Sequence, residues 1–72
     1  MISMLSQTSY IGRQLQQARQ KKGLTQAEVA DLVGTKTNYY AKLERGVAVP
    51  SLKMLEKVIE ALGAKSSDVL PF

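Results

Sequence analysis

Glycines divide this chain of 72 residues into short segments, and each segment carries a helical pattern of apolar residues. The apolar residues recur at spacings of three and four, and no segment alternates between apolar and polar residues as a strand does. Gly23, Gly34, Gly46 and Gly63 each follow one segment, at the position where glycine commonly ends a helix. The pattern predicts one all-α domain, since a chain of this length has room for only one.

Capping residues place the starts of the expected helices. Ser9, Thr25 and Ser51 each precede an apolar pattern and can accept a hydrogen bond from the first turn that follows. Thr25 and Glu28 have the spacing of a capping box, in which side chain and backbone bond reciprocally. We therefore expect helices over about residues 9–22, 26–33, 37–45 and 52–62, and a fifth from about residue 66. The buried stripe of the fourth helix is expected to be Leu52, Leu55, Ile59 and Leu62.

The chain start carries few packing signals. We expect residues 1–8 to form a flexible arm, as termini without such signals do, and residues 9–72 to form the domain. No apolar run approaches the ~18 residues of a membrane span. The first residues also lack the basic flank of a signal peptide. These features predict a cytoplasmic protein without a membrane partner.

The composition argues against catalysis. The sequence contains neither His nor Cys, which removes the usual general base, the thiolate nucleophile and the commonest metal ligands. The six carboxylates are scattered along the chain and form no catalytic cluster. We therefore expect no enzyme activity, no metal site and no cofactor.

The positive charge is concentrated in one part of the chain. The net charge is +4, from ten basic and six acidic residues. Seven basic and three acidic residues precede Gly46, whereas three of each follow it. A basic surface of this kind suits a polyanion, most often nucleic acid. Ordinary solubility explains the charge equally well when it is considered alone.

Residues 26–46 have the parts of a helix-turn-helix, in which two short helices are joined across Gly34. Ala30 is small enough to permit a close crossing of the helices, and Gly34 permits the positive φ of a tight turn. In such a motif the second helix enters the major groove of DNA. A plain helical hairpin would explain Ala30 and Gly34 separately, but not together with the basic surface.

Several motifs resemble those of the phage-repressor family, the Cro/CI or xenobiotic-response-element type. They are LTQAEVA at residues 24–30, Gly34, LERG at residues 43–46 and PSL at residues 50–52. The resemblance covers nearly the whole chain with the expected spacing. It implies a five-helix, lambda-repressor-like domain, with the helix-turn-helix over about residues 26–45. It also implies a homodimer that binds double-stranded DNA at a palindromic operator.

The resemblance also implies roles for individual residues. The positions that read base edges are Thr37, Asn38, Ala41 and Lys42. The positions expected to contact phosphates are Gln26, Lys36, Tyr39 and Arg45. An ion pair between Arg19 and Glu44 is expected to tie the first helix to the third, and Tyr40 is expected in the core with a hydroxyl that needs a partner.

Lys36 departs from the family pattern, because a Ser or Thr cap is usual at its position. A cation at a helix N-terminus caps nothing and opposes the helix dipole. Either the cap shifts by one residue, or Lys36 is kept for a phosphate contact. The register of the recognition helix therefore stays open by one position, between Thr37 and Asn38.

These features predict a sequence-specific transcription regulator, a repressor acting as a homodimer. The apolar residues least needed by the core place its dimer interface at Val49, Met54, Val69, Leu70 and Phe72, although Leu70 and Phe72 can also fold back onto their own core. An antitoxin with a toxin partner, a restriction-modification controller and a small phage repressor all fit this prediction. The alternative is a protein-interaction module of the same fold that has lost DNA binding.

Overall fold

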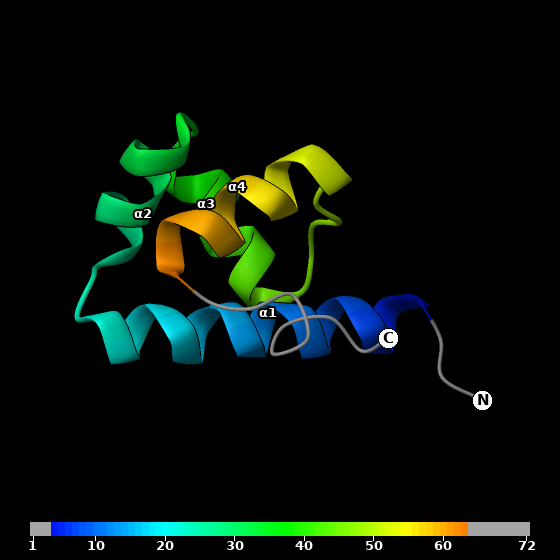
Figure 1. Cartoon of the computed structure of the whole chain (residues 1–72). Helices are drawn as coiled ribbons and strands as arrows, with labels where there is room; N and C mark the ends of the chain where they lie inside the picture. The colour runs from blue at the N-terminus through cyan, green and yellow to red at the C-terminus, as the bar shows by residue number, and fades with distance from the viewer. Residues whose placement is uncertain (1–3, 64–72) are drawn as a thin grey trace.

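The computed structural model describes residues 4–63 and contains four helices and no strand within them. The helices are α1 (Met4–Lys22), α2 (Gln26–Val33), α3 (Thr37–Arg45) and α4 (Leu52–Leu62). Figure 1 shows α1 as a long helix along one side of the molecule, with the three shorter helices packed above it. The prediction of an all-α domain is confirmed over these residues. The expected fifth helix lies outside the described residues.

The predicted caps of α2 and α4 are present. The Thr25 hydroxyl accepts a hydrogen bond from the Glu28 backbone N–H at 3.1 Å, and the Thr25 backbone N–H donates to the Glu28 carboxylate at 2.9 Å. The Ser51 hydroxyl accepts from the Met54 backbone N–H at 3.1 Å. These bonds satisfy backbone donors that no helical carbonyl can reach, so they set where both helices begin.

The expected start of the first helix was wrong. Helical backbone begins at Met4, upstream of the expected cap Ser9, and Ser9 lies inside α1. The residues between Met4 and Ser9 include no proline or glycine, and Met, Leu and Gln all have high helix propensity. Nothing local therefore stops the helix from extending upstream past Ser9.

The core is formed where α3 and α4 pack on α1 and where α2 packs on α3 and α4. It is composed of Leu15, Val29, Ala30, Val33, Tyr40, Leu43, Leu55, Val58, Ile59 and Leu62. The expected stripe of α4 needs one correction, because Leu52 is 70% exposed and Val58 is fully buried. Leu52 is the first residue of α4, one turn before Leu55, and the helix has not yet reached the core at that point. None of the described helices combines the length and the apolar character that a membrane span requires.

Candidate nucleic-acid interface

The turn between α2 and α3 has the geometry that the sequence predicts. Gly34 has φ of 75°, in the left-handed region that glycine adopts most readily. Its N–H donates to the Asp31 carbonyl at 3.2 Å, and the next N–H, of Thr35, donates to the Ala30 carbonyl at 2.9 Å. Ala30 itself is 1% exposed. The small side chain and the tight turn therefore hold α2 and α3 in the close crossing of a helix-turn-helix.

Helix α3 begins at Thr37, as the sequence predicts. Lys36 occupies the N-cap position with extended backbone, and its side chain makes no capping hydrogen bond. The cap has therefore not shifted to a neighbouring residue. Helix α3 starts with backbone N–H groups that no side chain caps, next to a lysine.

One face of α3 is buried and the opposite face is open. Tyr40, Leu43 and Glu44 are buried, and they recur at the spacing of one helical face. Of the four expected base-reading positions, Asn38 and Lys42 are exposed on the opposite face. Thr37 is exposed in the first turn, one turn before Tyr40, and Ala41 is half-buried at the edge between the two faces. The structure therefore places Asn38 and Lys42 together on the outward face of α3, with Thr37 and Ala41 along one edge of it.

The expected phosphate contacts flank that face. Lys36 and Arg45 are exposed at opposite ends of α3, and Tyr39 is half-buried against the core. Gln26 is half-buried, and its side-chain amide donates to the Glu44 carboxylate at 2.9 Å. One of the two amide hydrogens of Gln26 is therefore already used within the protein. No sequence pattern indicated this bond, because it joins residues 18 positions apart.

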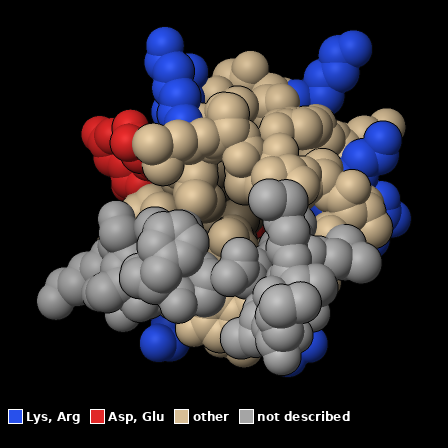
Figure 2. Space-filling view, turned by 90° about the vertical axis from the view of Figure 1, so that its right-hand side faces the viewer, with Lys and Arg blue, Asp and Glu red and all other residues tan. Residues whose placement is uncertain are grey.

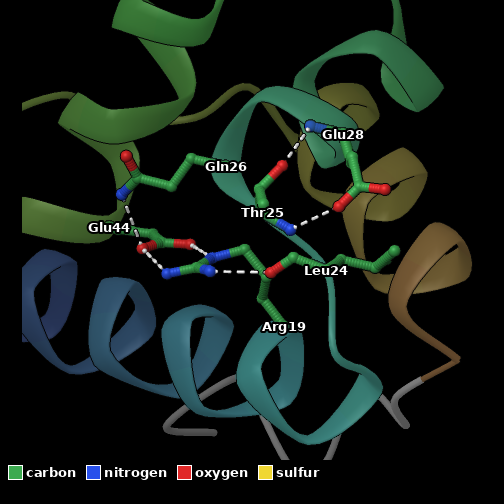
Figure 3. A network of polar contacts seen from close by, with 6 residues as sticks. All are labelled: Arg19, Leu24, Thr25, Gln26, Glu28 and Glu44. Carbon is green, nitrogen blue, oxygen red and sulfur yellow. Dashed lines mark hydrogen bonds and ion pairs between the residues drawn. The ribbon is translucent and has the colours of Figure 1, made fainter.

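The expected ion pair between α1 and α3 is present and mostly buried. Arg19 Nε donates to Glu44 Oε2 at 2.6 Å, and Arg19 Nη2 donates to Glu44 Oε1 at 3.1 Å. The exposed fractions of the two side chains are 12% for Arg19 and 2% for Glu44. Arg19 Nη1 also donates to the Leu24 carbonyl at 2.8 Å. Figure 3 shows the two bonds of Arg19 and the bond of Gln26 converging on the Glu44 carboxylate, while the third bond of Arg19 goes to the Leu24 carbonyl.

The ion pair controls the charge state of both partners. Burial acts to raise the pKa of Glu44, but the hydrogen bonds from Arg19 and Gln26 outweigh it, and the pKa lies below its ordinary value of 4.5. The hydrogen bond to Glu44 raises the pKa of Arg19. Both groups therefore stay charged at neutral pH, and α1, α2 and α3 are joined through one carboxylate.

Tyr40 is fully buried, as expected, but its hydroxyl lacks the partner that we expected it to need. The hydroxyl lies beside Arg19 and Glu44, near enough for both to act on its pKa, but within the described part of the chain no hydrogen bond of good geometry joins it to either residue. Burial raises the pKa of Tyr40, so the group stays neutral. A buried hydroxyl without a partner destabilises a fold by about 1–3 kcal/mol.

We therefore expect Tyr40→Phe to leave the free energy of unfolding unchanged or to raise it by up to about 1 kcal/mol. Urea denaturation measures the difference. Tyr39→Phe serves as the control, because it removes a hydroxyl from the half-buried neighbouring position. A loss of more than about 1 kcal/mol in Tyr40→Phe would show that the hydroxyl is hydrogen-bonded in solution.

The expected dimer residues are only partly visible. Val49 is 65% exposed in the loop between α3 and α4, together with Val47 at 66%. Met54 is partly buried against the core of its own chain. Val69, Leu70 and Phe72 lie outside the described residues. The dimer interface therefore stays a prediction. Of the expected residues, only Val49 is described as strongly exposed, in the loop between α3 and α4.

Two groups important for the geometry were not singled out from the sequence. Val58 completes the core of α4, and Gly12 is buried within α1. A signal for Gly12 was present, since a glycine inside a helical pattern often marks a close contact of backbones.

The comparisons with known proteins agree with this geometry. Residues 15–70 match the family described as Helix-turn-helix. Multiprotein-bridging factor 1 of Candida albicans is 46% identical over 55 residues, which make up 76% of this chain and 36% of that protein. The chain thus spans little more than a third of the length of this relative.

Solved structures share the fold over most of their length. The clp gene regulator ClgR from C. glutamicum superposes with a TM-score of 0.85 at 33% identity, covering 96% of this chain and 86% of that one. The restriction-modification controller protein C.Esp1396I, solved as a tetramer in complex with its natural 35 base-pair operator, has a TM-score of 0.77 at 25% identity. That match covers 90% of this chain and 83% of the controller.

The family match extends over more than half of the chain, and the described helices contain the close-crossed pair that defines the motif. The chain belongs to the Cro/CI-type helix-turn-helix family.

Proposed function

We propose that this chain binds a specific, palindromic sequence in double-stranded DNA as a homodimer and acts there as a repressor. The observation that carries the proposal is the outward face of α3, on which Asn38 and Lys42 are exposed, with Thr37 exposed at its edge, while the opposite face is anchored in the core. Side chains of these types can form hydrogen bonds with base edges in the major groove. The proposal includes no catalytic step.

The charge distribution supports a nucleic-acid partner. Lys36 and Arg45 stand at the two ends of the exposed face of α3, where they can reach phosphates on either side of the groove. Figure 2 shows Lys and Arg projecting from several edges of one face of the molecule, with Asp and Glu gathered mainly at its left edge. The similarity to a controller protein solved on its operator supports the same partner.

A homodimer follows from the small number of base contacts that one domain can make. A single recognition helix reads few base pairs, and two-fold symmetry doubles the contacts on half-sites one helical turn, ~34 Å, apart. The exposed Val47 and Val49 offer apolar area for such an interface.

The proposal is tested by selecting bound sequences from a random pool of DNA duplexes. We expect a palindromic consensus, and light scattering with that duplex should show two chains per site. A pool without enrichment would contradict specific binding. One chain per site at every concentration would contradict the dimer. A promoter fusion to a reporter gene then separates repression from activation.

Lys36→Ser should raise stability and lower DNA affinity at the same time. The Ser hydroxyl can cap α3, which typically stabilises a helix by about 1 kcal/mol, and the change removes a cation from the positive end of the dipole. If Lys36 contacts a phosphate in each half-site, the slope of log affinity against log salt falls by nearly two units in the dimer. Thermal unfolding and a salt titration measure the two effects. A more stable variant with an unaltered salt slope would show that Lys36 does not contact a phosphate.

A second function is favoured by one specific observation. The similarity to a multiprotein-bridging factor supports a protein-binding module of the same fold. Leu32 on α2 is 62% exposed and borders a groove of about 460 Å³ that is also lined by Val33, Lys57, Glu60 and Ala61. Loss of a binding partner in Leu32→Ser, together with no enrichment in the DNA selection, would favour this function. A toxin partner, as in an antitoxin, would be supported by a toxin gene next to this one.

A further inference from the structure

Helices α1 and α3 touch through their backbones. A Cβ atom added at Gly12 would collide with the carbonyl oxygen of Leu43 and would lie 2.5 Å from that of Glu44. One at Gly46 would lie 2.7 Å from the Cα of Ser9. Figure 1 shows the same arrangement, with the C-terminal end of α3 resting on α1. No side chain separates the two helices at this contact.

Gly12 is in an unfavourable place for a glycine unless the contact requires it. It lies in the middle of α1, where glycine destabilises a helix relative to alanine. It does not have a positive φ, unlike the glycines that end the four helices, so conformational freedom does not explain it. The close approach to α3 is therefore the reason for glycine at this position.

We propose that Gly12 is a positioning residue for operator recognition, because the absence of its side chain lets α1 hold the recognition helix at the depth and tilt that its exposed face needs. This inference rests on the proposed function of α3 in reading DNA. Gly12 acts through α3 and makes no contact with DNA itself.

The geometry shows how Gly12 can influence the position of α3. Helix α1 contacts Glu44 at two points. The carbonyl oxygen of Glu44 lies against Gly12, and the carboxylate of Glu44 is bound by Arg19. The atoms that block a methyl group at Gly12 belong to the backbone, so no side-chain rotation can relieve the clash. Since carbon and carbonyl oxygen normally stay about 3.3 Å apart, the helices would have to separate by about 1 Å.

A separation of this size matters for recognition. Binding groups must be held within about 0.5 Å of their productive geometry. The side chain of Glu44 remains tied to Arg19 and Gln26, so α3 cannot move away as a rigid body without strain and is expected to tilt relative to α2. The exposed face that carries Asn38 and Lys42 would tilt with it.

Gly12→Ala tests the proposal, with Val58→Ala as the matched control. Val58 is fully buried on α4, so its truncation also lowers stability. It leaves α1 and α3, the two helices that meet at Gly12, unchanged in sequence. Affinity for the selected operator and for a random duplex is measured at a temperature at which circular dichroism shows both variants to be folded. We expect the ratio of the two affinities to fall at least 10-fold in Gly12→Ala and to stay within twofold of wild type in Val58→Ala. Residual dipolar couplings should show a changed angle between α2 and α3 only in Gly12→Ala.

The outcomes separate this inference from the proposed function. An unchanged affinity ratio in a folded Gly12→Ala protein would overturn the inference. If the wild-type protein prefers no DNA sequence, the proposed function fails. The residual dipolar couplings then test whether Gly12 positions α3: a changed angle between α2 and α3 in Gly12→Ala supports that role, and an unchanged angle overturns it. If Gly12→Ala does not fold, the same ratio is measured in the Lys36→Ser background, which is expected to be more stable, and an unchanged ratio relative to Lys36→Ser alone also overturns the inference.

Discussion

Arg19→Ala is expected to lose about 3–5 kcal/mol of the free energy of unfolding, the range found when one partner of a buried ion pair is removed. The reason is the position of Glu44, whose side chain is 2% exposed and would keep its charge without the bidentate partner that neutralises it. The substitution also removes the donor of the Leu24 carbonyl. A domain of this size has a total stability of roughly 4–11 kcal/mol, so the variant should be close to unfolding.

Urea denaturation compares this variant with Lys21→Ala, which removes a charge from an exposed position two residues further along α1. We expect Lys21→Ala to change the midpoint little, since exposed charges contribute little to stability. The double variant Arg19→Ala/Glu44→Gln should recover part of the loss, because a neutral amide leaves no unpaired charge in the core. Equal urea midpoints for Arg19→Ala and Lys21→Ala would contradict a structural role for Arg19. They would favour a contact of Arg19 with DNA instead.

The pH dependence gives an independent check on the same pair. The pKa of Glu44 is lower in the folded protein than its ordinary value of 4.5, so the pair contributes stability above that value. This contribution is lost as the pH falls through the folded pKa and Glu44 becomes protonated. The stability difference between wild type and Arg19→Ala should therefore be full at pH 7 and shrink in acid. A difference that stays constant down to pH 2 would show that charge pairing is not its source.

The features that the sequence predicted well are those that local chemistry determines. The capping box of Thr25 and Glu28 and the left-handed turn at Gly34 depend on residues a few positions apart, and both are present. The pair of Arg19 and Glu44 is 25 positions apart in the sequence and was predicted only through the resemblance to a family. Its outcome shows that the resemblance extends to the packing of α1 on α3.

The features that sequence reasoning missed depend on where helices meet in space. Leu52 has the right spacing for the buried face of α4, but the core ends before it, and Val58 is buried instead. The bond from Gln26 to Glu44 depends on the distance between helices, which no periodic pattern encodes, and a glycine inside a helical pattern does not say which helix it meets. Whether the Tyr40 hydroxyl finds a hydrogen-bond partner also depends on how the helices pack around it.

Asn38→Ala and Lys42→Ala should each weaken binding to the selected operator by about 1–3 kcal/mol, which corresponds to about 5- to 150-fold. Asn38 and Lys42 are exposed one turn apart on the same face of α3, so a base-edge contact made by either is lost without damage to the core. Each substitution should also relax the preference at one or two base pairs of each half-site. Repeating the selection from random DNA with each variant measures both effects.

The two variants should differ in their non-specific binding, and this difference identifies what each residue contributes. Asn38→Ala removes no charge, so affinity for random DNA and the salt dependence should stay close to wild type. Lys42→Ala removes a cation beside the phosphates and should lower affinity on every sequence as well. Lys57→Ala on α4 is the matched control for charge, because it removes an exposed lysine away from the recognition helix. If Asn38→Ala selects the same operator as wild type with the same affinity, the position of Asn38 on α3 does not face the bases, and the recognition surface must be centred on Thr37 and Ala41 instead.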